Sequence, residues 1–130
     1  MGAPSDGPLV LDAGALIAFE RRVVRVRVLI ETALRHRRRL IVPAGVVAQV
    51  WRDGARQARM ATLVNDERVE VVALGLEEAK AVGLLCGRAR SRDVVDAHVA
   101  LVARRLTGTV VTSDRHDISR FDRSLRVVAV

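Results

Sequence analysis

Cysteine, aromatic residues and lysine are scarce in this sequence of 130 residues, and each scarcity excludes a class of site. Cys86 is the only cysteine, so an intramolecular disulfide and a cysteine zinc cluster are both excluded. We therefore expect a reducing, cytoplasmic location. Tyrosine is absent and there are only one tryptophan and two phenylalanines, so stacking of bases on aromatic rings is not expected to be the main mode of nucleic-acid binding.

Long hydrophobic runs are also missing. No apolar stretch approaches the roughly 18 residues that cross a bilayer. The start, MGAPSDG, lacks the basic region and apolar core of a signal peptide. Because half of the residues are hydrophobic, a sizeable core is possible. We expect a soluble protein that forms a single domain over residues 1–130, with residues 1–7 disordered and no contact with a membrane.

Positive charge, in contrast, is abundant. The 22 basic residues exceed the 15 acidic ones by seven, and every basic residue except Lys80 is an arginine. The guanidinium group offers a planar fork of donors that suits phosphate, so a polyanionic partner such as nucleic acid is predicted. Such a composition can also reflect codon usage, and a charge run is often only a solvated face. The candidates for nucleic-acid contact are Arg21, Arg22, Arg35, Arg37, Arg38 and Arg39.

Short apolar segments alternate with amphipathic segments along the chain. Strands are predicted at residues 8–11, 40–42, 69–73, 109–112 and 125–130. Helices are predicted at residues 15–20, 23–36, 43–53, 55–64, 76–86, 91–106 and 118–121. Strands that alternate with helices favour an α/β fold, in which a parallel sheet lies between helical layers.

Five aspartates fall where such a fold brings side chains together. Asp12 ends the first strand, Asp93 and Asp96 lie in the first turns of the long helix, and Asp114 and Asp117 follow the fourth strand. In open parallel sheets the ligand lies beyond the carboxyl ends of the strands, so these side chains are predicted to face one cleft. Clustered carboxylates repel each other, and a hard divalent cation is the usual remedy.

The same aspartates have a purely structural alternative. Ser91 can cap the long helix, with Asp93 favourable to the helix dipole, and Ser113 or Asp114 can cap the helix that follows. Asp12 separates the two interpretations, because it arrives at the same edge from a distant part of the chain.

Three segments carry a resemblance to a known family: LDAGALIAFE, IVPAGVVAQV and DAHVALVARRLTGTVVTSD. The order and spacing of these segments resemble those of the PIN domain of metal-dependent ribonucleases, and the resemblance extends from residue 9 to residue 130. Among these ribonucleases, the chain is most similar to the VapC-type toxins of bacterial toxin–antitoxin pairs. The resemblance implies a three-layer α/β/α sandwich with a central, mainly parallel five-stranded sheet. It also implies cleavage of RNA with Mg²⁺ or Mn²⁺, a homodimer, and inhibition by a cognate antitoxin protein.

The resemblance also assigns roles to individual acids. Asp12, Asp96 and Asp114 match the first, third and fourth acids of the family, and Asp117 matches an aspartate often found after the fourth. Asp12 and Asp96 are the expected direct metal ligands, while Asp114 and Asp117 would hold a second ion or orient water. A bound ion would lower the pKa of a coordinated water and stabilise charge on the phosphate.

Gln49 stands where the family has its second acid, a glutamate. An amide oxygen can accept a hydrogen bond but lacks the charge of a strong ligand. The cluster is therefore expected to recruit Asp93, one turn before Asp96, rather than Asp53, which is placed one turn after Gln49 on the same helix. Two neutral side chains are expected to hydrogen-bond the carboxylates: Thr112 and Ser113.

Other functions fit the sequence less well. A haloacid-dehalogenase-like phosphatase needs a second aspartate where Gly14 stands, and a response-regulator receiver needs a lysine near the last strand, whereas the only lysine is Lys80. The alternative that stays open is a catalytically weak or inactive PIN-like module that binds RNA or protein without cutting, which Gln49 favours.

None of the three histidines is expected to be catalytic. His36 lies in the arginine run and is expected to be solvated. His98 is expected to be a hydrogen-bonded helix residue rather than a metal ligand. His116 follows Asp114 closely and could contact substrate.

Overall fold

Five parallel strands form the centre of the molecule. The computed structural model describes residues 7–130 and places the strands in one sheet with the order β3-β2-β1-β4-β5. The strands are β1 (Leu9–Leu11), β2 (Leu40–Pro43), β3 (Val69–Val72), β4 (Thr109–Thr112) and β5 (Arg126–Ala129). The predicted α/β fold is confirmed, and its sheet is parallel throughout.

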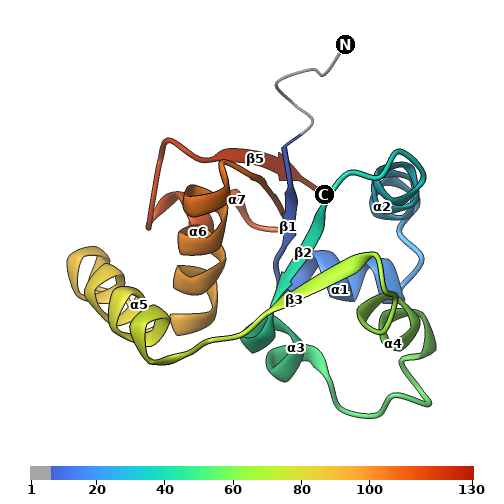
Figure 1. Ribbon diagram of the computed structural model, residues 1–130, viewed down its shortest axis with the longest axis horizontal. Coiled ribbons are helices and arrows are strands. Elements are labelled where there is room, and N and C mark those ends of the chain that lie inside the picture. Colours follow the sequence, from blue (N-terminus) through green and yellow to red (C-terminus); the bar gives the residue numbers. More distant parts are fainter. Residues whose placement is uncertain (1–6) are drawn as a thin grey trace.

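Helices cover both faces of this sheet. Those within residues 7–130 are α1 (Ala13–Glu20), α2 (Val24–Arg35), α3 (Ala44–Val50), α4 (Ala58–Val64), α5 (Leu76–Ala89), α6 (Val94–Leu106) and α7 (Arg115–Ser119). Helices α1, α2 and α4 lie on one face, whereas α6, with α5 and α7 against it, lies on the other (Figure 1). Helix α3 lies beyond the carboxyl end of β2 and packs against α1 and α6. The predicted three-layer sandwich is therefore present.

Strand β1 is fully enclosed at the centre of the sheet. All three of its residues are fully buried, and it lies between β2 and β4 with Leu11 opposite Val111. A strand whose sheet is covered by helices on both faces has apolar side chains at every position, which explains the sequence LVL. The next residue is Asp12, so the chain places its first carboxylate at the point where the central strand ends.

The boundary between α3 and α4 differs from the prediction. Helix α3 ends at Val50, and α4 begins at Ala58 rather than at residue 55. The side chain of Gln57 explains the gap. Its Oε1 accepts hydrogen bonds from the backbone N–H groups of Arg52 and Asp53, at 2.8 and 3.0 Å, and its Nε2 donates to the carbonyl of Val50 at 2.8 Å. These bonds satisfy backbone groups that a continued helix would otherwise have paired.

A further difference concerns the start of a helix. Helix α7 starts at Arg115 rather than at residue 118, because Asp114 caps it.

Residues 1–7 were expected to be disordered. Residues 1–6 lie outside the described residues, whereas the carbonyl of Gly7 accepts a hydrogen bond from Nε of Arg38 at 2.6 Å. No helix between residues 7 and 130 is long and apolar enough to span a membrane.

Candidate active site

Two neighbouring strands deliver aspartates to the same edge of the sheet. Asp12 follows β1 directly, and Asp114 follows β4 after one intervening residue. The two strands pair in parallel, with Leu11 opposite Val111, and the N–H of Asp12 donates to the carbonyl of Val111 at 3.2 Å. Both aspartates therefore leave the sheet at its carboxyl edge, where open parallel sheets bind their ligands.

Asp12 is a buried carboxylate that also starts a helix. Only 5% of its surface is exposed, and its Oδ1 accepts a hydrogen bond from the backbone N–H of Ala15 at 2.9 Å, which caps α1. Burial raises the pKa of its carboxyl group, hydrogen bonds from Thr112 and the helix start lower that pKa, and the charge of Asp117 raises it. The net pKa lies above the ordinary value of 3.8, so the ionised form of Asp12 is poorly compensated.

The start of α1 and the loop after β4 approach each other closely at Gly14. A Cβ atom on Gly14 would lie 1.9 Å from Oγ and 2.8 Å from Cβ of Ser113. Glycine is therefore required by space at this position. Among residues 7–130, Ser113 makes no side-chain hydrogen bond to a carboxylate, so what it contributes is this close packing between the Asp12 and Asp114 segments.

The start of α6 brings two more aspartates to the site. Asp93 is the N-cap, and its Oδ1 accepts a hydrogen bond from the N–H of Asp96 at 3.0 Å. Ser91, the predicted cap, instead accepts a hydrogen bond from the N–H of Asp93 at 3.1 Å and so positions the actual cap. Asp93 therefore does cap the helix, and it lies just before α6 rather than in its first turn.

Asp96 is the residue on which the other carboxylates act most strongly. Burial is the first cause that raises the pKa of Asp96 to about 7, followed by the hydrogen bond and charge of Asp93 and by the charges of Asp12 and Asp117. Three other carboxylates therefore help to hold a proton on this group. They come from the end of β1, the start of α6 and α7, which are segments far apart in the sequence.

The two aspartates after β4 differ in their surroundings. Oδ1 of Asp114 accepts a hydrogen bond from the N–H of His116 at 3.0 Å and caps α7, while the N–H of Asp114 donates to Oγ1 of Thr112 at 2.9 Å. Asp117 lies in the first turn of α7, and its charge raises the pKa of both carboxyl groups described above. We call the mutually repelling group the carboxylate cluster: Asp12, Asp93, Asp96 and Asp117.

The chemistry of the carboxylate cluster suits a hard divalent cation. No ion pair formed among residues 7–130 includes any of its four members. Over the same residues, no three histidine, cysteine or acidic side chains form a group that could hold a metal ion by themselves. Mg²⁺ usually keeps several waters and takes only one or two carboxylates directly. Two members of the cluster are therefore enough as direct ligands, and the donor set fits Mg²⁺ or Mn²⁺.

Comparison with known protein families decides which family this site belongs to. The PIN domain family matches residues 9–124. The chain belongs to the PIN domain family. PIN domains are generally nucleases and generally use divalent metal ions. None of the curated proteins that were compared matches this chain significantly.

Solved structures with low sequence identity share the whole fold of this PIN domain. One is described as FitAB bound to an IR36 DNA fragment, with 15% identity, 93% of this chain and 94% of that chain covered, and a TM-score of 0.64. FitAcB from Neisseria gonorrhoeae has 15% identity, 92% and 95% coverage, and a TM-score of 0.60. PAE2754 from Pyrobaculum aerophilum has 18% identity, 95% and 85% coverage, and a TM-score of 0.64. At these identities the likeness concerns the fold alone.

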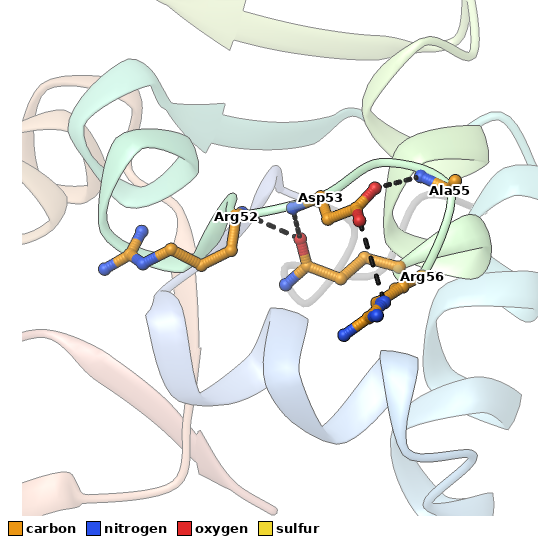
Figure 2. A network of polar contacts seen from close by, with 5 residues as sticks. Arg52, Asp53, Ala55 and Arg56 are labelled. Carbon is orange, nitrogen blue, oxygen red and sulfur yellow. Dashed lines mark hydrogen bonds and ion pairs between the residues drawn. The ribbon is translucent and has the colours of Figure 1, made fainter.

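This PIN domain carries Gln49 on the exposed surface of α3. Asp53, predicted one turn further along the same helix, lies outside it because α3 ends at Val50, so that prediction was wrong. Figure 2 shows the Asp53 carboxylate turned toward its own loop, where Oδ1 accepts a hydrogen bond from the N–H of Ala55 at 3.0 Å and Oδ2 pairs with Arg56 at 3.8 Å. Asp53 is thus held by its own loop and does not replace the missing glutamate.

His98 does not match its expected environment. It is buried in α6, and among residues 7–130 neither ring nitrogen has a hydrogen-bond partner, so the expected hydrogen bond is absent. Burial lowers the pKa of the imidazole, which favours the neutral form. Neutral His98 therefore acts as a packing residue on the face of the PIN domain that carries α5 and α6.

The arginines predicted to contact nucleic acid lie away from the carboxylate cluster. Residues 35–39 precede β2, so they lie at the amino edge of the sheet, opposite the acids. Arg39 is engaged there by Glu70 through two hydrogen bonds of 2.9 and 2.8 Å. Arg21 and Arg22 follow α1, at the end of that helix remote from its aspartate cap. Nucleic-acid contact by these arginines stays a prediction.

A second basic surface, which the sequence analysis did not identify, lies along α7, the helix that carries Asp117, and the residues that follow it. It surrounds a hollow of about 770 Å³ lined by Arg115, His116, Ser119, Arg120 and Arg123. A sequence signal for it exists, because three arginines and a histidine fall between residues 115 and 123, directly after Asp114. Three arginines in nine residues do not stand out in a chain with so many arginines. The denser run at residues 35–39 was therefore predicted to contact nucleic acid instead.

Proposed function

We propose that this PIN domain is a metal-dependent endoribonuclease that hydrolyses RNA phosphodiester bonds, and that it is the toxin of a toxin–antitoxin pair. The observation that carries the proposal is the convergence of carboxylates from three segments far apart in the sequence, none of which forms an ion pair within residues 7–130. The raised pKa of Asp96 is consistent with this crowding. Such crowding is unfavourable in a folded protein unless a cation relieves it.

Asp12 and Asp96 are the proposed direct ligands of Mg²⁺ or Mn²⁺. When bound, the ion would activate water for attack and stabilise the charge that develops on the phosphate. Asp114 and Asp117 would hold a second ion or orient the attacking water. The proton on Asp96 has to leave for that carboxylate to serve as a ligand, and Asp93 is the residue positioned to share it.

The neutral residues of the site would orient the acids. Thr112 is completely buried, its hydroxyl lowers the pKa of Asp12, and it exchanges hydrogen bonds with the backbone of Asp114 at 3.1 and 2.9 Å, so it would orient the acids at the ends of both strands. Ser113 would keep the loop after β4 against α1 through its contact with Gly14. Gln49 would accept a hydrogen bond through its amide oxygen, which supports weaker metal binding than a glutamate would give.

A cleavage assay tests the proposed activity. Purified protein, free of any antitoxin, is incubated with total RNA in the presence of Mg²⁺, Mn²⁺ or EDTA, and in parallel with single-stranded DNA. We expect RNA fragments with either ion and none with EDTA. Asp12→Asn and Asp96→Asn are the matched controls, because asparagine preserves the shape of both side chains and the helix cap made by Asp12 while it removes the charge. Fragments that persist in both variants or in EDTA would contradict the proposal.

The proposed partners are a cognate antitoxin and a second copy of the chain, in the cytoplasm. The structure described as FitAB bound to a DNA fragment supports a two-protein assembly for that relative, and we extend it to this chain as a proposal. Exposed apolar side chains support additional contacts. Val24 and Val28 are 62% and 52% exposed on α2, and Leu76 and Leu84 are 71% and 66% exposed on α5.

The alternative function is a PIN-like module that binds RNA or protein without cutting it. Gln49 favours this alternative, because the charge that the family places at this position is missing. The same cleavage assay separates the two functions. RNA that is retained by the protein but stays intact with both ions would support the binding module.

A further inference from the structure

The hollow beside α7 is a strongly basic surface without acidic lining. Its described lining residues are Arg115, His116, Ser119, Arg120 and Arg123, of which three are permanently charged. No aromatic side chain is among them, so a ligand held here would be recognised through anionic groups and hydrogen-bond acceptors rather than through stacking.

The charges of this hollow are not used to hold the fold together. Within residues 7–130, neither Arg120 nor Arg123 forms an ion pair. The nearby acid Asp122 is already engaged by Arg104, whose Nε lies 2.8 Å from its Oδ2. Arg115 donates only a long hydrogen bond of 3.4 Å to the carbonyl of Val127. The positive charge is therefore available to an external anion.

The hollow and the carboxylate cluster share one short helix. Asp117 acts electrostatically on Asp12 and Asp96, so its side of α7 faces the cluster. Arg120 lies three residues later in helical conformation, with φ −56° and ψ −35°. Residues three apart on a helix have Cβ atoms about 5–6 Å apart. The hollow therefore begins within one helical turn of the aspartate that acts on the cluster.

We propose that this hollow holds the phosphates of a single-stranded RNA whose scissile bond lies at the carboxylate cluster, with Arg120 and Arg123 as the principal contacts. The inference rests on the proposed ribonuclease function and adds to it the surface that holds the substrate. A planar guanidinium binds phosphate through two parallel hydrogen bonds, which gives affinity without reading the base. The recognition at this surface is therefore independent of sequence.

The test measures RNA binding without cleavage. Wild-type protein in EDTA is titrated into a fluorescent single-stranded RNA of about 16 nucleotides and mixed sequence, and anisotropy is followed over a range of salt concentrations. The variant is Arg120→Ser/Arg123→Ser. The charge-matched control is Lys80→Ser/Arg88→Ser, on the exposed surface of α5. Circular dichroism establishes that all three proteins are folded.

We expect the hollow variant to bind roughly tenfold more weakly near physiological salt, and the control to change less than about twofold. The slope of log Kd against log salt should fall by about 1.4, because each phosphate contact on a single strand contributes about 0.7. Arg120→Lys/Arg123→Lys should keep most of that slope, since the charges are retained. Equal losses in hollow variant and control, or an unchanged slope, would overturn the inference.

Two further outcomes separate this inference from the proposed function. If the hollow variant loses RNA affinity but wild-type protein cuts no RNA with Mg²⁺ or Mn²⁺, the binding surface stands and the ribonuclease proposal fails. If wild-type protein cuts RNA and the hollow variant binds and cuts equally well, only the inference fails. A polyglutamate peptide that competes with RNA at equal charge concentration would overturn it too, because the hollow would then suit an acidic protein.

Discussion

Replacing Asp96 with asparagine should stabilise the metal-free protein above neutral pH while removing its metal affinity. The folded protein holds a proton on Asp96, with a pKa of about 7 instead of 3.8, because burial and neighbouring carboxylates disfavour the charge. Folding raises the pKa of this group, so its protonated form stabilises the folded protein fully below about pH 4, the unfolded pKa. That contribution is lost as the pH rises to the folded pKa of about 7. Asparagine mimics the protonated form at every pH, so the variant avoids this loss.

The size of the effect follows from the difference between the two pKa values. The interval from 3.8 to about 7 is roughly three units, and at about 1.4 kcal/mol per unit the limit is roughly 4 kcal/mol. Because Asp96 is only partly buried, solvent screening reduces this value, and we expect about 2 kcal/mol. For a domain of this length that corresponds to a rise in Tm of about 8 °C.

Thermal unfolding in EDTA across the pH range measures this difference directly. Wild type and Asp96→Asn should unfold at the same temperature near pH 4 and diverge until about pH 7. Asp122→Asn is a control with the opposite sign, because hydrogen bonds from Ser124 and Arg104 hold the pKa of Asp122 below its usual range. It should lose stability above about pH 4. A pH-independent difference between wild type and Asp96→Asn would refute the reasoning.

Three more predictions concern the same edge of the sheet and the assembly. In metal titrations, Asp93→Asn should weaken metal binding and Gln49→Glu should strengthen it. Mn²⁺ should bind more readily than Mg²⁺. Unchanged metal affinity in Asp93→Asn would mean that Asp93 only caps α6. Gly14→Ala should lower stability in urea unfolding by about 1–3 kcal/mol through overpacking against Ser113, and adding Ser113→Gly should restore part of the loss. Sedimentation at micromolar concentration should show a dimer, and a strictly monomeric species would count against the proposed assembly.

The parts of the fold set by local pattern could be predicted from the sequence. The apolar runs LVL and TVVT were predicted as buried strands, and the positions of Asp12 and Asp114 at their carboxyl ends followed directly. The direction of a parallel strand then fixes which edge its terminal residue reaches. The same rule, applied to β2, would have placed residues 35–39 at the opposite edge, so this placement was available from the sequence and was missed.

The rest of the site depends on contacts that no local pattern reveals. Helix α3 ends at Val50 because the side chain of Gln57, seven residues later, occupies the loop. Asp117 was predicted at this site, but its position in the first turn of α7 was not, because α7 begins at Arg115, three residues before the predicted start. The missing partner of His98 was equally hidden, since it depends on how α5 and α6 pack.

Because Asp12, Asp93 and Asp114 each cap a helix, the choice of an inactive variant affects how any cell-based experiment is read. Alanine at these positions removes a capping hydrogen bond worth about 0.5–2 kcal/mol together with the charge. Lower abundance could then pass for lost catalysis in a growth assay. Asparagine keeps the cap, so a strain that carries it reports on the chemistry at near-normal protein levels.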